Sequence, residues 1–256
     1  MSEEVSSQLK PVFKMSTESL SSWWRHLPKF LMLYVWGILY MAIPGIILFA
    51  LHLALMALAM SSAVGVGIIV LRIVMIVLAF IATLFLAYYF IRLVISFFLL
   101  IKYDYKGDEL KIFKDSRHYF WSYFWLKLLV LILVTLWSLL LVIPGLIFMV
   151  FYAMAIYVFF WEGKKGMEAI KRSKRLVKNH WWAVTGRLLF MLAAIYLFEL
   201  IIIVLPLHWL GNLTVIGIIW TMIATLIIYI VIPVILIFMY KLYRSLAKIY
   251  KPKHIK

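Results

Sequence analysis

The chain has 256 residues, of which 67% are apolar and only 14% are charged. A soluble domain has roughly 45–50% apolar and about 25% charged residues, so this composition excludes an ordinary soluble globular protein. The formal net charge is +16 and the chain has no cysteine, which excludes disulfides, thiolate metal sites and cysteine nucleophiles. Residues 1–26 are polar and lack the apolar region and cleavage site of a signal peptide, so we expect none to be removed.

Six apolar regions follow in chain order, and between positions 29 and 102 the only ionised side chains are Arg72 and Arg92. This stretch far exceeds the roughly 20 apolar residues that a transmembrane helix needs. We therefore predict an all-α fold, a polytopic membrane bundle of about six transmembrane helices in three hairpins, each preceded by a short amphipathic interfacial helix. The six regions are 27–60, 64–101, 121–143, 146–161, 181–207 and 213–240.

Basic residues alternate with apolar regions in a regular way. They gather in the N-terminal segment, in the connections 102–120 and 162–187, and in the tail, whereas 61–67, 144–145 and 208–212 contain no Lys or Arg. The positive-inside rule then places the basic connections and both termini on the cytoplasmic side of the cell membrane.

The chain also contains three degenerate copies of one unit. Each copy reads apolar, Lys, any residue, Ser, and then an aromatic pair; the serines are Ser16, Ser116 and Ser173, and the pairs end at Trp24, Trp125 and Trp182. We treat 1–256 as a single integral membrane domain. Its repeats cover about 11–103, 110–161 and 166–245, with a basic tail at 241–256.

The third copy has the clearest amphipathic pattern. Its apolar positions, from Ala169 to Trp181, follow the spacing of one helical face. We expect this stripe to rest against lipid, while the basic residues face water and anionic headgroups. The pattern fits a simple positive-inside anchor or specific binding of a lipid or protein partner. The basic residues are Lys171, Arg172, Lys174, Arg175 and Lys178.

Two Pro-Gly pairs follow the aromatic pairs at similar spacing. Pro44-Gly45 and Pro144-Gly145 each lie about 30 Å of helix beyond an aromatic pair, which is one hydrocarbon thickness. We predict that both pairs mark turns at the outer ends of spans. Residues 46–101 then form either a long bent helix pair or a segment that re-enters the membrane with its tip near 61–67.

Few ionisable residues lie inside the predicted spans, and such residues are functional candidates. Arg72 and Glu199 have similar predicted depths, and His52 could join them. The cluster would be either a structural ion pair or a relay for protons or substrate. Arg92 and Lys127 lie nearer the cytoplasmic ends, so we expect their long side chains to reach the headgroups.

No catalytic, nucleotide-binding or metal-binding motif is present, and the six histidines are dispersed. We therefore expect no catalytic site, no cofactor and no metal. Each basic cluster adjoins a predicted span, so anionic lipid explains these clusters better than nucleic acid does.

Residues 161–182, preceded by the Ile-Pro-Gly at 143–145, resemble a bacterial and archaeal membrane family. It comprises the membrane domain attached to some glycerophosphodiester phosphodiesterases and many stand-alone six-span proteins. The shared features are the Pro-Gly, a short span, an acidic-Gly loop and an "EAlkrS…W" helix. The resemblance implies a membrane module that associates with lipid or with another protein. The phosphodiesterase activity belongs to a separate soluble domain, so no catalytic residue carries over.

Three functions remain in competition. The first is a non-catalytic integral membrane protein, a lipid-associated scaffold or a subunit of a membrane complex or homo-oligomer. The second is a small transporter or channel that uses Arg72, Glu199 and His52, although its predicted midplane is nearly all apolar. The third, an enzyme acting on lipid headgroups, has no motif behind it.

Overall fold

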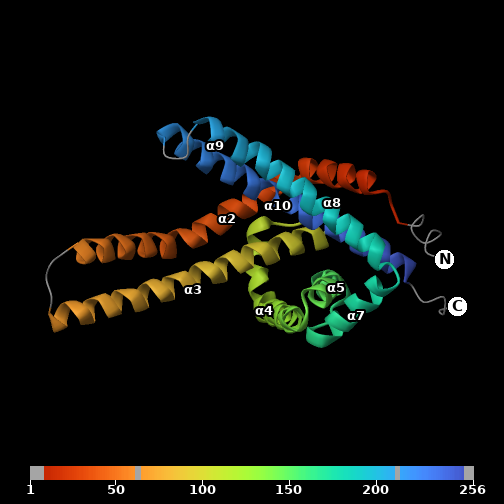
Figure 1. Cartoon of the computed structure of the whole chain (residues 1–256), viewed down its shortest axis with the longest axis horizontal. Helices are drawn as coiled ribbons and strands as arrows, with labels where there is room; N and C mark the ends of the chain where they lie inside the picture. The colour runs from red at the N-terminus through yellow and green to blue at the C-terminus, as the bar shows by residue number, and fades with distance from the viewer. Residues whose placement is uncertain (1–8, 61–64, 211–213, 251–256) are drawn as a thin grey trace. The chain divides into compact units, whose positions relative to one another are not determined.

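The described residues are 9–60, 65–210 and 214–250 of a computed structural model, and all regular secondary structure in these ranges is helical (Figure 1). Apolar runs in a bilayer form helices because only an internally bonded backbone avoids unsatisfied polar groups. The helices are α2 (Val12–Met60), α3 (Val66–Lys102), α4 (Glu109–Leu140), α5 (Val142–Tyr152), α6 (Ala155–Glu162), α7 (Gly166–Lys178), α8 (Trp181–Glu199), the π-helix η1 (Leu200–Val204), α9 (Leu205–Leu210) and α10 (Val215–Ile249).

Within the described ranges, six helical stretches are long and apolar enough to cross a membrane. This confirms the predicted all-α polytopic bundle and its count of six spans, and the chain is a multi-pass membrane protein. The fourth span consists of α5 and α6, and the fifth consists of α8, η1 and most of α9. The six stretches are Val12–Leu58, Val66–Lys102, Glu109–Leu139, Val142–Glu162, Trp181–Trp209 and Val215–Ile249.

The chain forms two compact units. The larger unit contains Met1–Pro28 and Trp121–Lys256, and the hairpin unit contains Lys29–Phe120. The division falls within α2 and within α4, and it does not follow the repeat boundaries of the sequence. The three repeats therefore stay a prediction.

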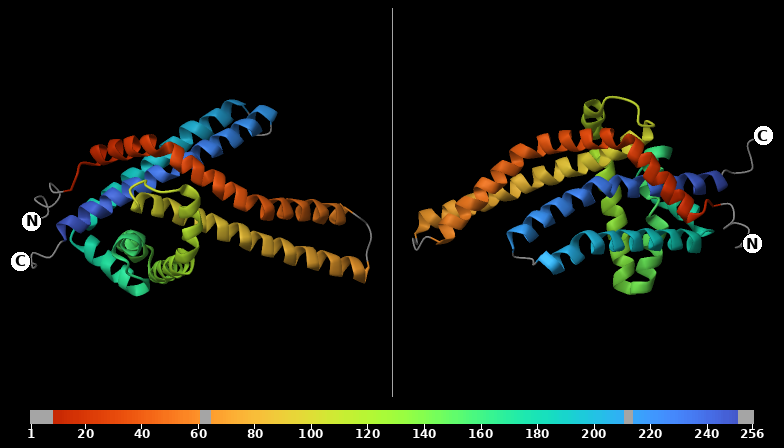
Figure 2. Two further views of the ribbon diagram at one scale, coloured as in Figure 1. Left: turned by 180° about the vertical axis from the view of Figure 1, so that it is seen from behind. Right: turned by 90° about the horizontal axis from the view of Figure 1, so that it is seen from above.

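In the hairpin unit, α2 and α3 run side by side in opposite directions (Figures 1 and 2). Phe30 packs edge-on against Phe97, with ring centroids 5.7 Å apart, and Leu33 and Leu99 are fully buried nearby. Of the two arrangements considered for 46–101, the structure shows the long helix pair. Residues 61–64, which follow α2 in the chain, lie outside the described residues.

The two Pro-Gly pairs have different structural roles, and only the second lies at the end of a span as predicted. Pro44 and Gly45 lie inside α2, so a turn at this pair is wrong. In an apolar solvent, ending the helix would strip partners from several backbone groups, whereas proline removes only one bond. Pro144 and Gly145 lie in the first turns of α5, after the break at Leu141.

Gly145 is required by a close approach between helices. A Cβ at this position would lie 2.9 Å from the Cα of Ser138, so only glycine lets α5 pack this closely on α4. A Cβ at Gly45 would meet no atom within 4 Å. A methyl group would therefore clash with α4 at Gly145 and meet open space at Gly45, although both glycines belong to a Pro-Gly pair.

In the larger unit, α8, η1 and α9 lie beside α10 (Figures 1 and 2). Pro206 has no N–H to donate to the carbonyl of Ile202, four residues earlier. The indole N–H of Trp220 donates to that carbonyl instead, at 2.9 Å. The indole of Trp23 donates to the carbonyl of Ile230 on α10, at 3.1 Å.

We predict opposite effects for Gly145→Ala and Gly45→Ala. The first forces α5 away from α4 and lowers the thermal midpoint in detergent. The second replaces a helix-interior glycine in open space, where alanine favours the helix by about 0.5–1 kcal/mol. Gly45→Ala should therefore raise the thermal midpoint. Equal shifts for the two variants would contradict the close approach at Gly145.

Candidate functional site

The helix α7 is a separate short helix held between two breaks. Gly163 ends α6 with φ 70°, a left-handed conformation that glycine adopts without strain. At the other end, α7 stops at Lys178, and α8 begins at Trp181. A separate short helix is therefore present where the sequence predicts one for the third repeat, and its interfacial location stays a prediction.

The apolar stripe of α7 packs on protein rather than on lipid, which corrects the prediction for this face. Ala169, Ile170, Leu176 and Val177 are buried against α5 and α6. Ser173 in the middle of the stripe donates its hydroxyl to the carbonyl of Phe151 at 2.7 Å. Hydrocarbon offers no acceptor for the Ser173 hydroxyl, so a stripe that contains this serine is more stable against protein than against lipid.

The outer face of α7 is basic from Lys171 to Lys178. At about 100° per residue, its exposed cations lie within an arc of roughly 100° opposite the buried stripe. We call these four residues the basic stripe: Lys171, Lys174, Arg175 and Lys178, all exposed.

Arg172, the fifth predicted basic residue, has a different role. Its Nε donates to both carboxylate oxygens of Glu162 at 2.9 and 3.1 Å. Its guanidinium lies 4.7 Å from the ring centroid of Tyr250, and Tyr243 also donates to Glu162, at 3.2 Å. Arg172 therefore anchors α7 and is not available to a headgroup in the way the basic stripe is.

The first two repeats do not form separate interfacial helices. Their motifs lie near the starts of α2 and α4, which continue without a break into the apolar regions. The third copy differs because Asn179 and His180 interrupt the helix. The prediction of a short interfacial helix before every hairpin is therefore wrong for the first two.

The repeated serines and tryptophans nevertheless share a pattern. Each serine donates to a backbone carbonyl: Ser16 to Val12, Ser116 to Phe113 and Ser173 to Phe151. The tryptophans point outward, with exposures of 69% for Trp24, 56% for Trp125 and 81% for Trp182. Exposed indoles beside basic segments are typical of the membrane interface.

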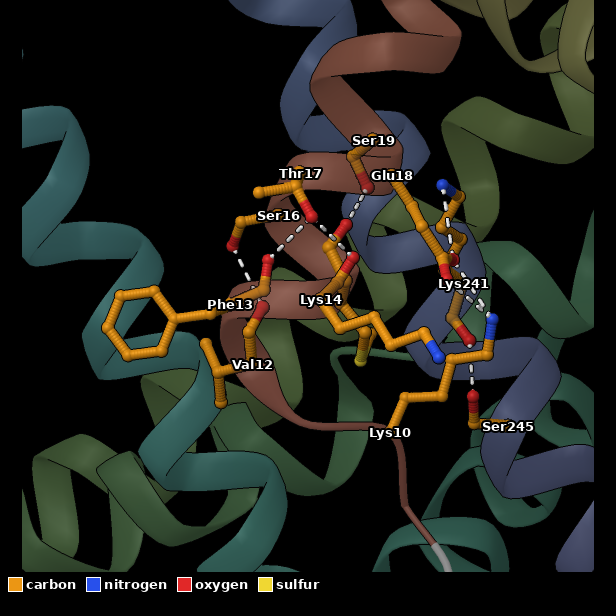
Figure 3. Close-up of polar contacts among 11 residues, drawn as sticks. Lys10, Val12, Phe13, Lys14, Ser16, Thr17, Glu18, Ser19, Lys241 and Ser245 are labelled. Atoms are coloured by element: carbon orange, nitrogen blue, oxygen red, sulfur yellow. Dashed lines mark hydrogen bonds and ion pairs between the residues drawn. The ribbon is translucent and has the colours of Figure 1, made fainter.

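Within the larger unit, polar contacts that sequence reasoning missed hold the N-terminal segment against α8 and α10. The carboxylate of Glu18 pairs with two lysines: its Oε2 lies 2.9 Å from the Nζ of Lys10 and 3.7 Å from the Nζ of Lys241 (Figure 3). Arg187 is buried and donates to the carbonyls of Lys10 and Ala183, each at 2.9 Å. The contacts of Arg187 with Lys10 and of Lys241 with Glu18 join residues far apart in sequence, so no local pattern indicates them.

The predicted cluster of Arg72, Glu199 and His52 is divided between the units. In the hairpin unit, Arg72 donates to the carbonyl of Leu58 at 2.6 Å, and His52 also lies on α2. Glu199 ends α8 in the larger unit, directly before η1. There it lines a groove of about 460 Å³ formed by α2, α8 and α10. The pairing of Glu199 with Arg72 stays a prediction.

Arg92 is buried rather than extended toward headgroups, which corrects the snorkelling prediction for this residue. It is 7% exposed. Its Nη2 donates to the carbonyl of Phe113 at 2.8 Å, and its Nε donates to Ser116 at 3.2 Å. Residues on α4 thus provide partners within the protein. The corresponding expectation for Lys127 stays a prediction.

Among the residues that the structure describes, no group of three or more His, Asp or Glu side chains is placed to hold a metal ion. Comparisons with protein-family models, with curated proteins and with solved structures found no match. The site is therefore interpreted from its own geometry.

We predict that the α7–α8 junction loses stability in acid through His180. Burial lowers the pKa of this half-buried imidazole below its ordinary value of 6.5, and an interaction with the Leu176 backbone opposes the shift only in part. Below about pH 6.5 the unfolded chain binds the proton more readily than the folded chain, so folding stability falls as the pH falls.

The thermal midpoints of the wild type, His180→Gln and His118→Gln, measured in detergent at about pH 7.5 and 5.5, check this. His118 is exposed, and its variant should keep the acid sensitivity of the wild type. His180→Gln should lose part of it. If all three proteins lose the same amount on acidification, His180 does not cause the effect.

Proposed function

We propose that this protein is a non-catalytic scaffold or subunit of a membrane complex in the cell membrane, and that the basic stripe binds anionic lipid headgroups at the cytoplasmic surface. One observation supports this above the others. The four cations of the stripe lie on one exposed face of a helix whose opposite face is fixed on protein. Both termini would also lie on the cytoplasmic side, as the positive-inside rule indicates.

The strength of such binding follows from the number of charges. A Lys or Arg near an anionic membrane surface contributes about 1 kcal/mol, and the attraction decays within a Debye length of roughly 8 Å. Four cations on one face thus supply about 4 kcal/mol. The Arg172–Glu162 ion pair and the Ser173–Phe151 hydrogen bond hold the helix in place, so little ordering of the backbone is needed on binding.

The exposed tryptophan after α7 supports the same orientation. Trp182 begins the next span and is almost fully exposed. Indole rings favour the headgroup level, because they combine an apolar body with one polar N–H. Trp182 and the basic stripe therefore suit the same interfacial layer.

A small transporter is the second candidate function. Glu199 is exposed on the apolar second half of its span, precedes a π-helix and lines the groove between α8 and α10. Such helix irregularities and intramembrane carboxylates often mark functional sites. In this alternative, Glu199 binds a proton or a cationic substrate.

Neutralising the basic stripe should abolish most of the anionic-lipid preference. We predict that replacing all four residues with glutamine weakens phosphatidylglycerol binding by at least about a hundredfold, since each charge contributes about fivefold. The matched control exchanges Lys for Arg and Arg for Lys at the same positions and should bind as the wild type does.

Native mass spectrometry of the purified protein, titrated with phosphatidylglycerol or phosphatidylcholine, measures both affinities. A glutamine variant that keeps the wild-type preference would contradict the proposal. Recovery of the wild type from its own membrane with a stoichiometric protein on the stripe, and without retained anionic lipid, would replace the lipid by a protein partner.

The substitution Glu199→Gln distinguishes the two candidate functions. It keeps the shape of the side chain and removes its charge, so the scaffold proposal predicts unchanged lipid binding by the basic stripe. The transporter alternative predicts that flux into vesicles is lost while the protein stays folded. Flux that depends on Glu199 would favour transport, and no flux in either protein would favour the scaffold.

A further inference from the structure

Arg92 is a buried cation in the hairpin unit whose partners are all neutral. Its guanidinium lies 4.7 Å from the ring centroid of Phe113 and 5.5 to 5.9 Å from those of Tyr40, Tyr88 and Tyr89. Among the described residues, no carboxylate lies within 4.0 Å of it. The nitrogens Nε and Nη2 make hydrogen bonds, and within the described part of the chain Nη1 has no acceptor.

A buried charge without a counter-ion is costly even after the protein relaxes around it. Ring faces and carbonyls offset part of this cost. In a membrane span, such a cation is a candidate for binding an anion. The donors on Nη1 are suited to phosphate, which guanidinium recognises through charge-assisted hydrogen bonds.

An apolar groove begins beside this cation. It runs between α2 and α3 within the hairpin unit and has a volume of about 760 Å³, within the usual range for ligand pockets. Tyr40 and Tyr89 belong both to its lining and to the rings around Arg92. Its far end is lined by Leu51 and Leu78.

The length of the groove suits a lipid chain. Its lining on α2 extends from Trp36 to Leu51, which is about 22 Å at helical rise. One leaflet of the hydrocarbon core is about 15 Å thick. A tilted acyl chain fits this length.

The position of Arg92 suits a headgroup at the edge of the hydrocarbon. Arg92 lies ten residues before the end of α3 at Lys102, about 15 Å along the helix. The 37 residues of α3 span about 55 Å, which exceeds the 30 Å core, so the helix tilts or extends beyond the core. A tilt of α3, or extension of its Lys102 end into the headgroup layer, brings Arg92 within about 15 Å of the boundary, where a phosphate can reach it by local thinning.

We propose that the groove between α2 and α3 binds one acyl chain of an anionic phospholipid, with its phosphate at Arg92. The rings of Tyr40 and Tyr89 line the same end of the groove. A phosphodiester stays ionised at this depth, whereas a fatty-acid carboxyl takes up a proton when it is desolvated. This site is separate from the basic stripe and does not depend on it.

The test uses the full chain with all four basic-stripe residues changed to glutamine, so that the stripe does not contribute. Native mass spectrometry compares phosphatidylglycerol with phosphatidylcholine of identical acyl chains. One phosphatidylglycerol should remain bound about tenfold more tightly, as expected for a charge-assisted contact. Equal binding of the two lipids in this background would overturn the proposal and leave the basic-stripe proposal unaffected.

Variants of the groove then locate the lipid. Ile81→Trp fills the groove, which Ile81 lines, and should weaken both lipids. Ile76→Trp is the matched control, because Ile76 is a similarly exposed isoleucine on α3 outside the lining, and it should bind normally. Arg92→Gln should remove the preference for phosphatidylglycerol, and Arg92→Lys should restore part of it. Equal binding by the two tryptophan variants overturns the proposal even if Arg92→Gln fails to fold.

Discussion

The absence of water from the hydrocarbon core is the constraint on which the structure depends. Every backbone group in a span needs a partner within the protein. The proline inside α9 disturbs the helical ladder, and an indole N–H compensates: Trp220 donates to the Ile202 carbonyl that Pro206 leaves without a backbone donor. The helix α10 continues through Pro233 without breaking.

The same constraint sorts the basic residues into two groups. Arg92 and Arg187 are buried and donate to carbonyls and a hydroxyl, while Arg172 is paired with Glu162. These arginines join helices, because a planar guanidinium satisfies several acceptors at once. The basic stripe of α7 remains exposed on a fixed scaffold. The basic residues behind the net charge of +16 therefore include some that hold helices together and others that remain exposed for a partner.

The sequence predicts the features that depend on length and hydropathy. The six spans follow from apolar runs, and α7 follows from its helical spacing. Features that depend on distant partners were not predictable. The amphipathic pattern of α7 indicates that one face avoids water. It does not distinguish a protein neighbour from lipid, because both favour the same apolar residues. Arg92 meets Ser116 across 24 positions, so its position near a predicted boundary indicated snorkelling instead. A turn at Pro44 and Gly45 failed because a local helix-breaking preference is weaker than the cost of exposed backbone in lipid.

The central claim is a six-span protein that presents the basic stripe of α7 at the cytoplasmic surface, and single-cysteine labelling tests it most directly. The chain has no native cysteine, so Lys174→Cys and Val142→Cys each provide one reactive site. Val142 is exposed at the start of α5, and Lys174 is exposed on α7. With a membrane-impermeant maleimide, intact cells should label only the cysteine at 142, and inverted membranes only the cysteine at 174. Labelling of both positions from the same side, or in the reverse order, would contradict the account.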